Sequence, residues 1–272
     1  MRYVGITFLA LLVSSVAFGN VYEDLSAPTP VVGPASGPTA NVSGPILWDN
    51  GGLSMNVCAP ADDESFIEPD GCSLYGWGMQ QTAGPNRMAD NFVIPPGEMW
   101  AVKSVELFGY QTGATTPSMT GVDLNVWIGA PGAPGSILAC SYPQALIAVA
   151  WAEGPLMGPG SRIRRTSAIN NCDTARLYQS MLCVGFDGSC ACLPEGEYYL
   201  DWSCAGTLSS GPWQPPVVPG DETTDNALQS VDGGVTWNPA LDSGCGLPKD
   251  VPFILRGISC ASTPVDQTTW GR

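Results

Sequence analysis

Glycine and proline are the feature that most constrains this sequence, because they interrupt it too often for long regular elements. The chain has 33 Gly and 25 Pro among 272 residues. Both residues weaken the interior of a helix, and both are favoured in turns. The sequence therefore predicts many turns, few long helices and a fold assembled from strands.

Alternating segments lie between these turns. Residues 122–128 read VDLNVWI, with an apolar side chain at every second position. Residues 197–204 read EYYLDWSC, where one face carries Tyr, Leu, Trp and Cys and the other carries Asp201. A period of two is typical of strands. Further β-rich segments are 89–94, 99–110, 136–141, 145–151, 163–167, 176–184 and 252–258.

Strands at this spacing predict an all-β fold, a single antiparallel β-sandwich of jelly-roll type with long loops and disulfides. The turn Pro95-Pro96-Gly97 separates two of the expected strands. The folded domain is expected over 45–272, which is long for a sandwich. Its large loops are expected at 50–88, 152–162 and 205–225.

The first 19 residues have the character of a secretory signal peptide. Arg2 precedes the apolar run 4–17, and small residues follow it. This run is too short for a membrane span. Residues 20–44 are rich in Pro, Gly, Ala, Ser and Thr, as in a flexible linker. We therefore expect an exported protein without a membrane span, located outside the cell, at its surface or in the periplasm.

The cysteine count agrees with export, because an even number in an exported chain indicates disulfides. The ten cysteines are Cys58, Cys72, Cys140, Cys172, Cys183, Cys190, Cys192, Cys204, Cys245 and Cys260. A zinc site is disfavoured, because no CxxC pair occurs and the spacing of Cys190 and Cys192 is too tight. Connectivity does not follow from sequence, and the least demanding pairs are Cys58–Cys72 and Cys245–Cys260.

Histidine is absent from the sequence. This absence excludes Ser-His-Asp and Cys-His hydrolases in their usual form, and also His-ligated zinc or copper. No nucleophile motif is present, so the chain is predicted not to be an enzyme. Carboxylate chemistry stays open, because glycoside hydrolysis needs only two acids. The strand-borne candidates are Asp90, Glu106, Asp123, Glu197 and Asp201, although most acids on strands face water.

The net charge is -15, which disfavours nucleic acid and anionic lipid as partners. Five carboxylates fall within 62–70. Clustered carboxylate oxygens are what calcium prefers, so Asp62, Asp63 and Glu64 are candidate calcium ligands, and calcium is the only cofactor considered. The spacing lacks the EF-hand order, and a solvated acidic loop is the favoured interpretation. A second acidic stretch, 220–226, is a further candidate contributor.

Residues 230–237 read SVDGGVTW, which resembles the Asp-box of sialidases. Physically the motif is a hairpin turn, in which Asp232 accepts backbone N–H groups, Gly234 supplies a positive φ and the Trp packs beneath. In sialidases it recurs once per propeller blade. A single copy therefore predicts a structural hairpin, not a catalytic site.

Aromatic side chains in loops are the candidate ligand-binding residues. Trp77, Trp213 and Tyr75 lie beside Gly or Pro. An exposed ring stacks on the apolar face of a sugar, and nearby polar groups bind its hydroxyls. The alternative is that these residues pack internally, which is the interpretation preferred for the strand-associated Trp48, Trp100, Trp127, Trp202 and Trp237. The only basic cluster, 161–165, is expected to be a solvated strand face.

Four stretches together resemble a group of uncharacterised exported bacterial proteins predicted to form β-sandwiches. They are ADNFVIPPGEMWAVKSVELFGYQTG, VDLNVWIGAPGAPGS, LPEGEYYLDWSCAGTLSSGPWQPP and DNALQSVDGGVTWNPALDSGCGLPKDVPFILRG. The resemblance covers most of residues 45–258 and implies fold and export only. Some relatives carry a C-terminal sorting segment. This chain stops at Gly271-Arg272 without one, so anchoring by that route is not expected.

Three hypotheses of function follow. The first is a non-catalytic extracellular binding or surface-matrix module, with a glycan as partner. The second is a carboxylate-dependent glycoside hydrolase, and the third is a structural protein that assembles with copies of itself. Binding requires exposed aromatic rings, hydrolysis requires paired acids in a cleft, and self-assembly requires an uncovered sheet edge or apolar patch.

Overall fold

The computed structural model describes most of the chain from residue 44 onward. The described residues are 22–23, 44–55, 63–67, 71–82, 85–167, 176–184 and 192–260. The predicted signal peptide 1–19, most of the linker, Asp62, Cys58, Cys172 and Cys190 lie outside them. Within the described residues the fold is all-β, and no helix there could cross a membrane.

The strands number sixteen within the described residues. They are β1 (Tyr22–Glu23), β2 (Ile46–Asp49), β3 (Glu64–Ile67), β4 (Gly76–Gly78), β5 (Arg87–Gly109), β6 (Met119–Ile128), β7 (Ile137–Tyr142), β8 (Leu146–Trp151), β9 (Arg164–Ser167), β10 (Arg176–Leu177), β11 (Gln179–Val184), β12 (Leu193–Gly206), β13 (Trp213–Gln214), β14 (Leu228–Ser230), β15 (Asn238–Pro239) and β16 (Phe253–Ser259). Pairing is antiparallel except between β3 and β9.

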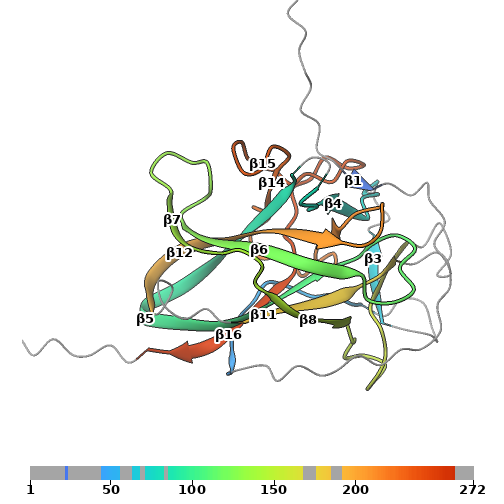
Figure 1. The fold of residues 1–272 in the computed structure, drawn as a ribbon, viewed down its shortest axis with the longest axis horizontal. Helices are drawn as coiled ribbons and strands as arrows, with labels where there is room; N and C mark the ends of the chain where they lie inside the picture. The colour runs from blue at the N-terminus through green and yellow to red at the C-terminus, as the bar shows by residue number, and fades with distance from the viewer. Residues whose placement is uncertain are drawn as a thin grey trace, which may run out of the picture.

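Strand β5 organises the fold because it belongs to both layers (Figure 1). Its first half lies between β14 and β12. The sheet continues from β14 to β15, and from β12 to β6 and β7. Its second half lies between β11 and β16, which continue to β8 and β2. Because β5 changes partner strands along its length, the two parts of the sheet that it joins enclose a common core.

The sequence predicted two strands here, separated by a turn at 95–97, and this prediction is wrong. The structure has one continuous strand that changes partners near this point. Gly97 has a φ of 82°, and β12 has a register shift between Pro194 and Gly196 opposite the prolines. Proline cannot donate to a ladder and is tolerated at such irregularities, so the strand continues through it.

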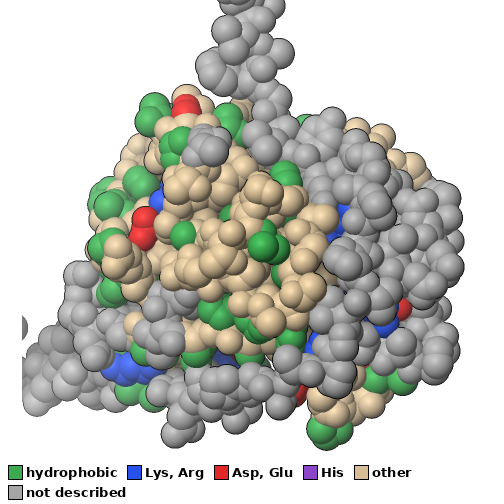
Figure 2. Space-filling view, turned by 45° about the vertical axis from the view of Figure 1, so that its right-hand side comes forward, with side chains coloured by type: hydrophobic (Ala, Val, Ile, Leu, Met, Phe, Trp, Pro, Cys, Tyr) green, Lys and Arg blue, Asp and Glu red, His purple; other side chains and the backbone are tan. Residues whose placement is uncertain are grey.

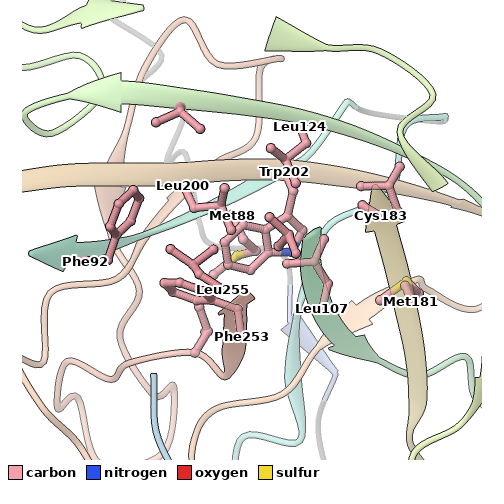
Figure 3. Close-up of a cluster of buried hydrophobic side chains, with 14 of the residues drawn as sticks. Met88, Phe92, Leu107, Leu124, Met181, Cys183, Leu200, Trp202, Phe253 and Leu255 are labelled. Atoms are coloured by element: carbon pink, nitrogen blue, oxygen red, sulfur yellow. The ribbon is translucent and has the colours of Figure 1, made fainter. Parts of the chain in front are cut away.

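The main core fills the space between the two layers, as Figure 3 shows for side chains of β5, β6, β11, β12 and β16. Trp202 of β12 meets Phe253 of β16 edge-on, with ring centroids 5.9 Å apart. Both side chains are fully buried. Burying an aromatic side chain stabilises a fold by about 1.5–3 kcal/mol. The alternation predicted for 122–128 and 197–204 therefore reflects one face packed in this core.

A second, smaller core is rich in tyrosine. Tyr110 and Tyr178 stack with centroids 6.1 Å apart, and the Arg176 guanidinium lies 4.0 Å from the centroid of the Tyr75 ring. All four side chains are buried. The short strands β3, β9 and β10 lie beside this core, so part of the predicted loop 50–88 is structured. Tyr22 and Glu23, inside the predicted linker, form β1 against β4.

The cysteine predictions need correction. Cys72 bonds to Cys245 and Cys192 bonds to Cys260, so the proposed pairs Cys58–Cys72 and Cys245–Cys260 are wrong. Cys140 is also disulfide-bonded. Cys183 and Cys204 are free and buried, contrary to the prediction that all ten are oxidised. Their alternating positions place them in the main core as small apolar residues, where burial raises the pKa of both thiols.

Candidate functional site

The outer face of the large sheet carries a cluster of polar and aromatic side chains. Residues of β5, β12 and β6 that alternate with core residues point to this side. The sheet-face cluster is Arg87, Asn125, Trp127, Asp201 and Ser203. Asp201 pairs in register with Asn125, and Trp127 pairs with Tyr199, two residues before Asp201 on the same face. Three adjacent strands therefore bring these groups together from distant parts of the sequence.

Asp201 is the centre of this cluster. It is 1% exposed, and its Oδ1 accepts from Arg87 Nε at 2.6 Å. Its Oδ2 accepts from Asn125 Nδ2 at 2.9 Å and from Trp127 Nε1 at 3.0 Å. Arg87 also donates to the hydroxyl of Ser203 at 3.2 Å. The carboxylate therefore fixes the orientation of an indole and an amide on the sheet surface.

Two opposing effects act on the pKa of the Asp201 carboxyl, namely burial and the donors that surround it. Burial raises the pKa of its carboxyl, whereas Arg87 and the hydrogen bonds from Asn125 and Trp127 oppose the rise. A carboxylate with a cationic partner and two further donors is suited to holding side chains in place. Both of its oxygens have protein donors, so in this arrangement it orients Trp127 and Asn125.

Next to Asp201, two polar atoms have no hydrogen-bond partner among the described residues. They are the Tyr199 hydroxyl and the Asn125 amide oxygen, whose amide nitrogen is used by Asp201. Burial, then Glu197, Asp90 and Asp250, raise the pKa of Tyr199 to about 12, so its hydroxyl stays protonated. Trp127 is partly exposed. Tyr199 is only 6% exposed, so the surface offers mainly the Trp127 ring and the Asn125 amide acceptor, with the Tyr199 hydroxyl beneath it.

The SVDGGVTW hairpin borders this face. Trp237 donates from Nε1 to the Gly234 carbonyl at 3.1 Å. Gly234 packs against the Arg87 side chain, since a Cβ built on this glycine would lie 3.3 Å from Arg87 Cδ. Gly132, in the turn before β7, packs against Trp237 in the same way, with 3.0 Å from such a Cβ to Trp237 Cδ1. Figure 1 shows the β14–β15 hairpin and the turn before β7 at the same end of the molecule. The hairpin therefore packs between that turn and the sheet-face cluster.

The predicted structural role of this motif is confirmed. Asp232 Oδ1 accepts from Thr236 N at 2.9 Å and from Ser230 Oγ at 2.8 Å. Gly233 and Gly234 have φ angles of 79° and 94°. The backbone N–H of Thr236, then its hydroxyl and that of Ser230, lower the pKa of Asp232 to about 2. The aspartate holds the turn closed, as expected from its sequence.

The aromatic residues chosen from sequence lie elsewhere. Trp77 and Tyr75 are fully buried, so neither presents a ring face to solvent. Trp77 donates from Nε1 to the Leu241 carbonyl at 3.2 Å, which fixes it inside the fold. Trp213 is half-buried and donates to Ser210 Oγ at 3.2 Å. Loop position and neighbouring glycines did not indicate exposure, because Gly76 and Gly78 lie in strand β4 beside Trp77.

The calcium candidates that can be described are both buried. Asp63 Oδ2 accepts from Leu156 N at 2.9 Å. Glu64 lies 3.6 Å from Arg164 Nε. Asp62 lies outside the described residues. Asp63 thus accepts a backbone N–H and Glu64 faces a cation, and the interpretation of a solvated loop is wrong for both residues because their side chains are fully buried.

Within the described ranges, one trio of residues has ligand atoms close enough together to hold a metal ion, namely Cys72, Asp242 and Cys245. The two sulfurs are joined in a disulfide, so no thiolate is available there. Asp242 accepts from the backbone N–H of Ser73, Leu74 and Gly244 at 2.8–3.1 Å. This carboxylate therefore anchors the loop around the disulfide.

The other strand carboxylates each have a protein partner. Glu106 accepts from Ser180 at 2.6 Å, Asp123 accepts from Gln144 N at 2.9 Å, and Glu197 accepts from Asn91 at 2.9 Å. Asp90 is fully buried and accepts from Asn50 at 2.8 Å. Burial, and then the like charge of Asp250, raise its pKa well above the usual value.

The basic cluster is also placed differently from the expectation of a solvated face. Arg162 and Arg165 are 8% and 3% exposed. The Arg162 guanidinium lies 5.3 Å from the centroid of the Trp151 ring, and Arg165 donates to Ser65 Oγ at 3.0 Å. The expectation of a solvated face is therefore wrong for these two cations. Their long side chains are buried against an aromatic ring and a hydroxyl group.

Trp127 was expected in the core, and Asn125 and Tyr199 were not among the residues expected to bind a ligand. The period of two in VDLNVWI contained the missing signal, because Asn125 and Trp127 fall on the face opposite Leu124 and Val126. Figure 2 shows a face on which uncharged side chains and backbone predominate, with few charged groups near its centre.

No family model, no curated protein and no solved structure matches this chain.

Proposed function

We propose that the protein is an exported, non-catalytic binding module that binds a neutral glycan on the outer face of its large sheet. The observation that carries the proposal is the partly exposed Trp127 ring, held by Asp201 beside the Asn125 amide, with Tyr199 in register with Trp127 on β12. The ring suits the apolar C–H face of a pyranose. The two polar atoms suit sugar hydroxyls, which both donate and accept.

Preorganisation supports a binding role. The Asp201 carboxylate and the Arg87 guanidinium fix Trp127 and Asn125 before any ligand arrives. A rigid aromatic side chain loses little conformational entropy on binding, so more of the contact energy becomes affinity. The two described disulfides agree with an oxidising environment outside the cytoplasm.

The test is a glycan-array measurement on oxidised protein from residue 20 onward, with calcium and with a chelator. We expect binding to a neutral glycan in both conditions, because the described site needs no metal. Trp127→Ala should reduce affinity at least about tenfold through loss of the stacked ring. Tyr199→Phe removes one hydroxyl and should cost less.

Trp213→Ala is the matched control, because Trp213 is also a half-buried tryptophan but lies beside the small core. It should leave affinity unchanged. Circular dichroism and thermal melting establish that each variant is folded. Absence of binding to every glycan, or binding that folded Trp127→Ala retains in full, would overturn the proposal. Binding abolished only by Trp213→Ala would move the site to the region predicted from sequence.

A further inference from the structure

Strand β7 is an edge strand of the large sheet. It pairs with β6 on one side, and among the described strands none pairs with its other side. An edge strand presents unpaired backbone N–H and C=O groups that can accept another strand. Natural edges are commonly protected by charged residues or proline. The sequence of β7, ILACSY, contains neither.

The exposed side chains of this edge are apolar. Ile137 is 59% exposed and Leu138 is 45% exposed. Ile128, which pairs with Ile137 in register, is 45% exposed. Ile128 and Ile137 share one face of the sheet, whereas Leu138 pairs with Trp127 and lies on the other face, so both faces of this edge expose aliphatic side chains. The edge therefore combines unpaired backbone groups with a small apolar surface.

The distribution of charge favours contact between two copies at this edge. The chain has a net charge of -15, so most approaches between copies are repulsive. Residues 124–152 contain no Asp, Glu, Lys or Arg. This interval includes all of β7 and β8, and the second half of β6. Two copies that approach through β7 thus meet with uncharged strands facing each other.

We infer that β7 pairs antiparallel with β7 of a second copy, forming a symmetric dimer. A two-fold contact places the same residues on both sides, and an uncharged apolar strand is complementary to itself. The register shift between Val126 and Trp127 leaves Ala139 as an extra residue in β7. This bulge shortens the regular edge, so we expect a weak dimer with a Kd on the order of micromolar.

The dimer is inferred independently of glycan binding, but it would change how the proposed glycan site is presented. Antiparallel pairing through a two-fold axis perpendicular to the sheet puts the outer faces of both copies on the same side. Two sheet-face clusters would then be presented together. Simultaneous engagement of a repeating ligand would strengthen binding without any new contact.

The test is sedimentation velocity of oxidised protein from residue 20 onward, at concentrations from about 1 to 500 μM. We expect a reversible monomer–dimer equilibrium. Leu138→Lys should weaken it at least about tenfold, because like charges would meet across the pair. Ile258→Lys is the matched control: Ile258 is 51% exposed on β16, a strand that pairs with β5 and β2, and this variant should dimerise as wild type.

Charge complementation separates this contact from loss of folding. Leu138→Lys and Leu138→Glu should each be monomeric when alone, with unchanged circular dichroism. Their equimolar mixture should form heterodimers, because opposite charges would then face each other. Wild-type protein that stays monomeric over the whole range would overturn the inference. So would a dimer that Leu138→Lys leaves intact, or a mixture of folded variants that stays monomeric.

Discussion

Asp201 and Asp90 lie close together on paired strands but on opposite faces of the same sheet. In the β5–β12 ladder Asp201 is opposite Ala89, and Asp90 is the next residue along β5. Successive side chains alternate between faces, so one carboxyl enters the outer cluster and the other faces inward. Asp201 is 1% exposed and Asp90 is fully buried. Their degree of burial is thus nearly the same.

Their partners differ in charge. Asp201 has the Arg87 guanidinium at 2.6 Å. Asp90 has only neutral donors, the Asn50 amide at 2.8 Å and backbone N–H groups including that of Val251 at 2.8 Å. Its charged neighbour is Asp250, whose like charge adds to burial in raising the pKa of Asp90.

Asp250 shows why the pair persists. Burial alone would raise its pKa, but the backbone N–H groups of Thr224, Asn226 and Thr223 outweigh that effect and lower it. Asp250 therefore carries the negative charge and holds the loop around 223–226, while the proton is favoured on Asp90. A buried carboxyl is thus tolerated either by a counter-charge or by protonation.

The largest expected effect comes from removing the counter-charge. Arg87→Leu leaves Asp201 buried beside neutral donors only, and we expect a loss of about 3 kcal/mol in the free energy of unfolding. Denaturant unfolding of the oxidised protein at pH 7 measures it. Adding Asp201→Leu to the same chain should recover part of the loss, because the unpaired charge is gone. Strictly additive effects of the two substitutions would contradict the pairing.

The second prediction concerns pH and Asp90. Because its pKa is raised in the folded state, the native protein binds this proton more tightly than the unfolded chain does. Its stabilising contribution is therefore present below pH 3.8 and is lost as pH rises toward the folded pKa. Asp90→Asn does not titrate, so its stability relative to wild type should increase from pH 4 to pH 8. The expected gain is about 1.4 kcal/mol for each unit of pKa shift.

Denaturant unfolding at several pH values tests this prediction. Asp221→Asn is a suitable control, because Asp221 is exposed on the nearby loop that packs on Gly52. This control should follow the wild-type pH dependence. A constant difference between Asp90→Asn and wild type across the range would show that Asp90 titrates normally. The contrast between the two buried aspartates would then be lost.

The smallest expected effect concerns Asp232, an exposed residue whose pKa is lowered, whereas that of Asp90 is raised. Asp232→Ala removes the acceptor of Thr236 N. We expect faster hydrogen exchange at the Thr236 amide, with little change in global unfolding. The lowered pKa means that the turn keeps this stabilisation above pH 3.8 and loses it as pH falls toward about 2. Unchanged exchange at Thr236 would contradict the role of this carboxylate.

Local patterns in the sequence predicted much of the fold. The alternation in 122–128 and 197–204 located strands β6 and β12, because one face of each packs in the core. The hairpin at 230–237 followed from its own residues, since Asp232 bonds to groups within a few positions of it. Such features depend on neighbours in the chain, so their physical cause is visible in the sequence.

Contacts between distant residues could not be predicted in this way. Cys72 and Cys245 are 173 residues apart, and nothing local selects that pairing. Trp77 has the glycine neighbours of a loop residue, yet tertiary packing buries it completely. The alternation of Trp127 with Val126 indicated its face, but only the pairing of β6 with β12 brings Asp201 to its indole N–H.

The sequence by itself thus determined an all-β chain, its strand periodicity and its hairpin turn, because these depend on backbone preferences and on contacts within a few residues. Only the tertiary structure decided which aspartate received Arg87 and which was left beside another aspartate. It also decided which tryptophan reached the surface and which strand became an edge. Those outcomes depend on how β5, β12 and β6 pair, and strand pairing joins residues that no local pattern relates.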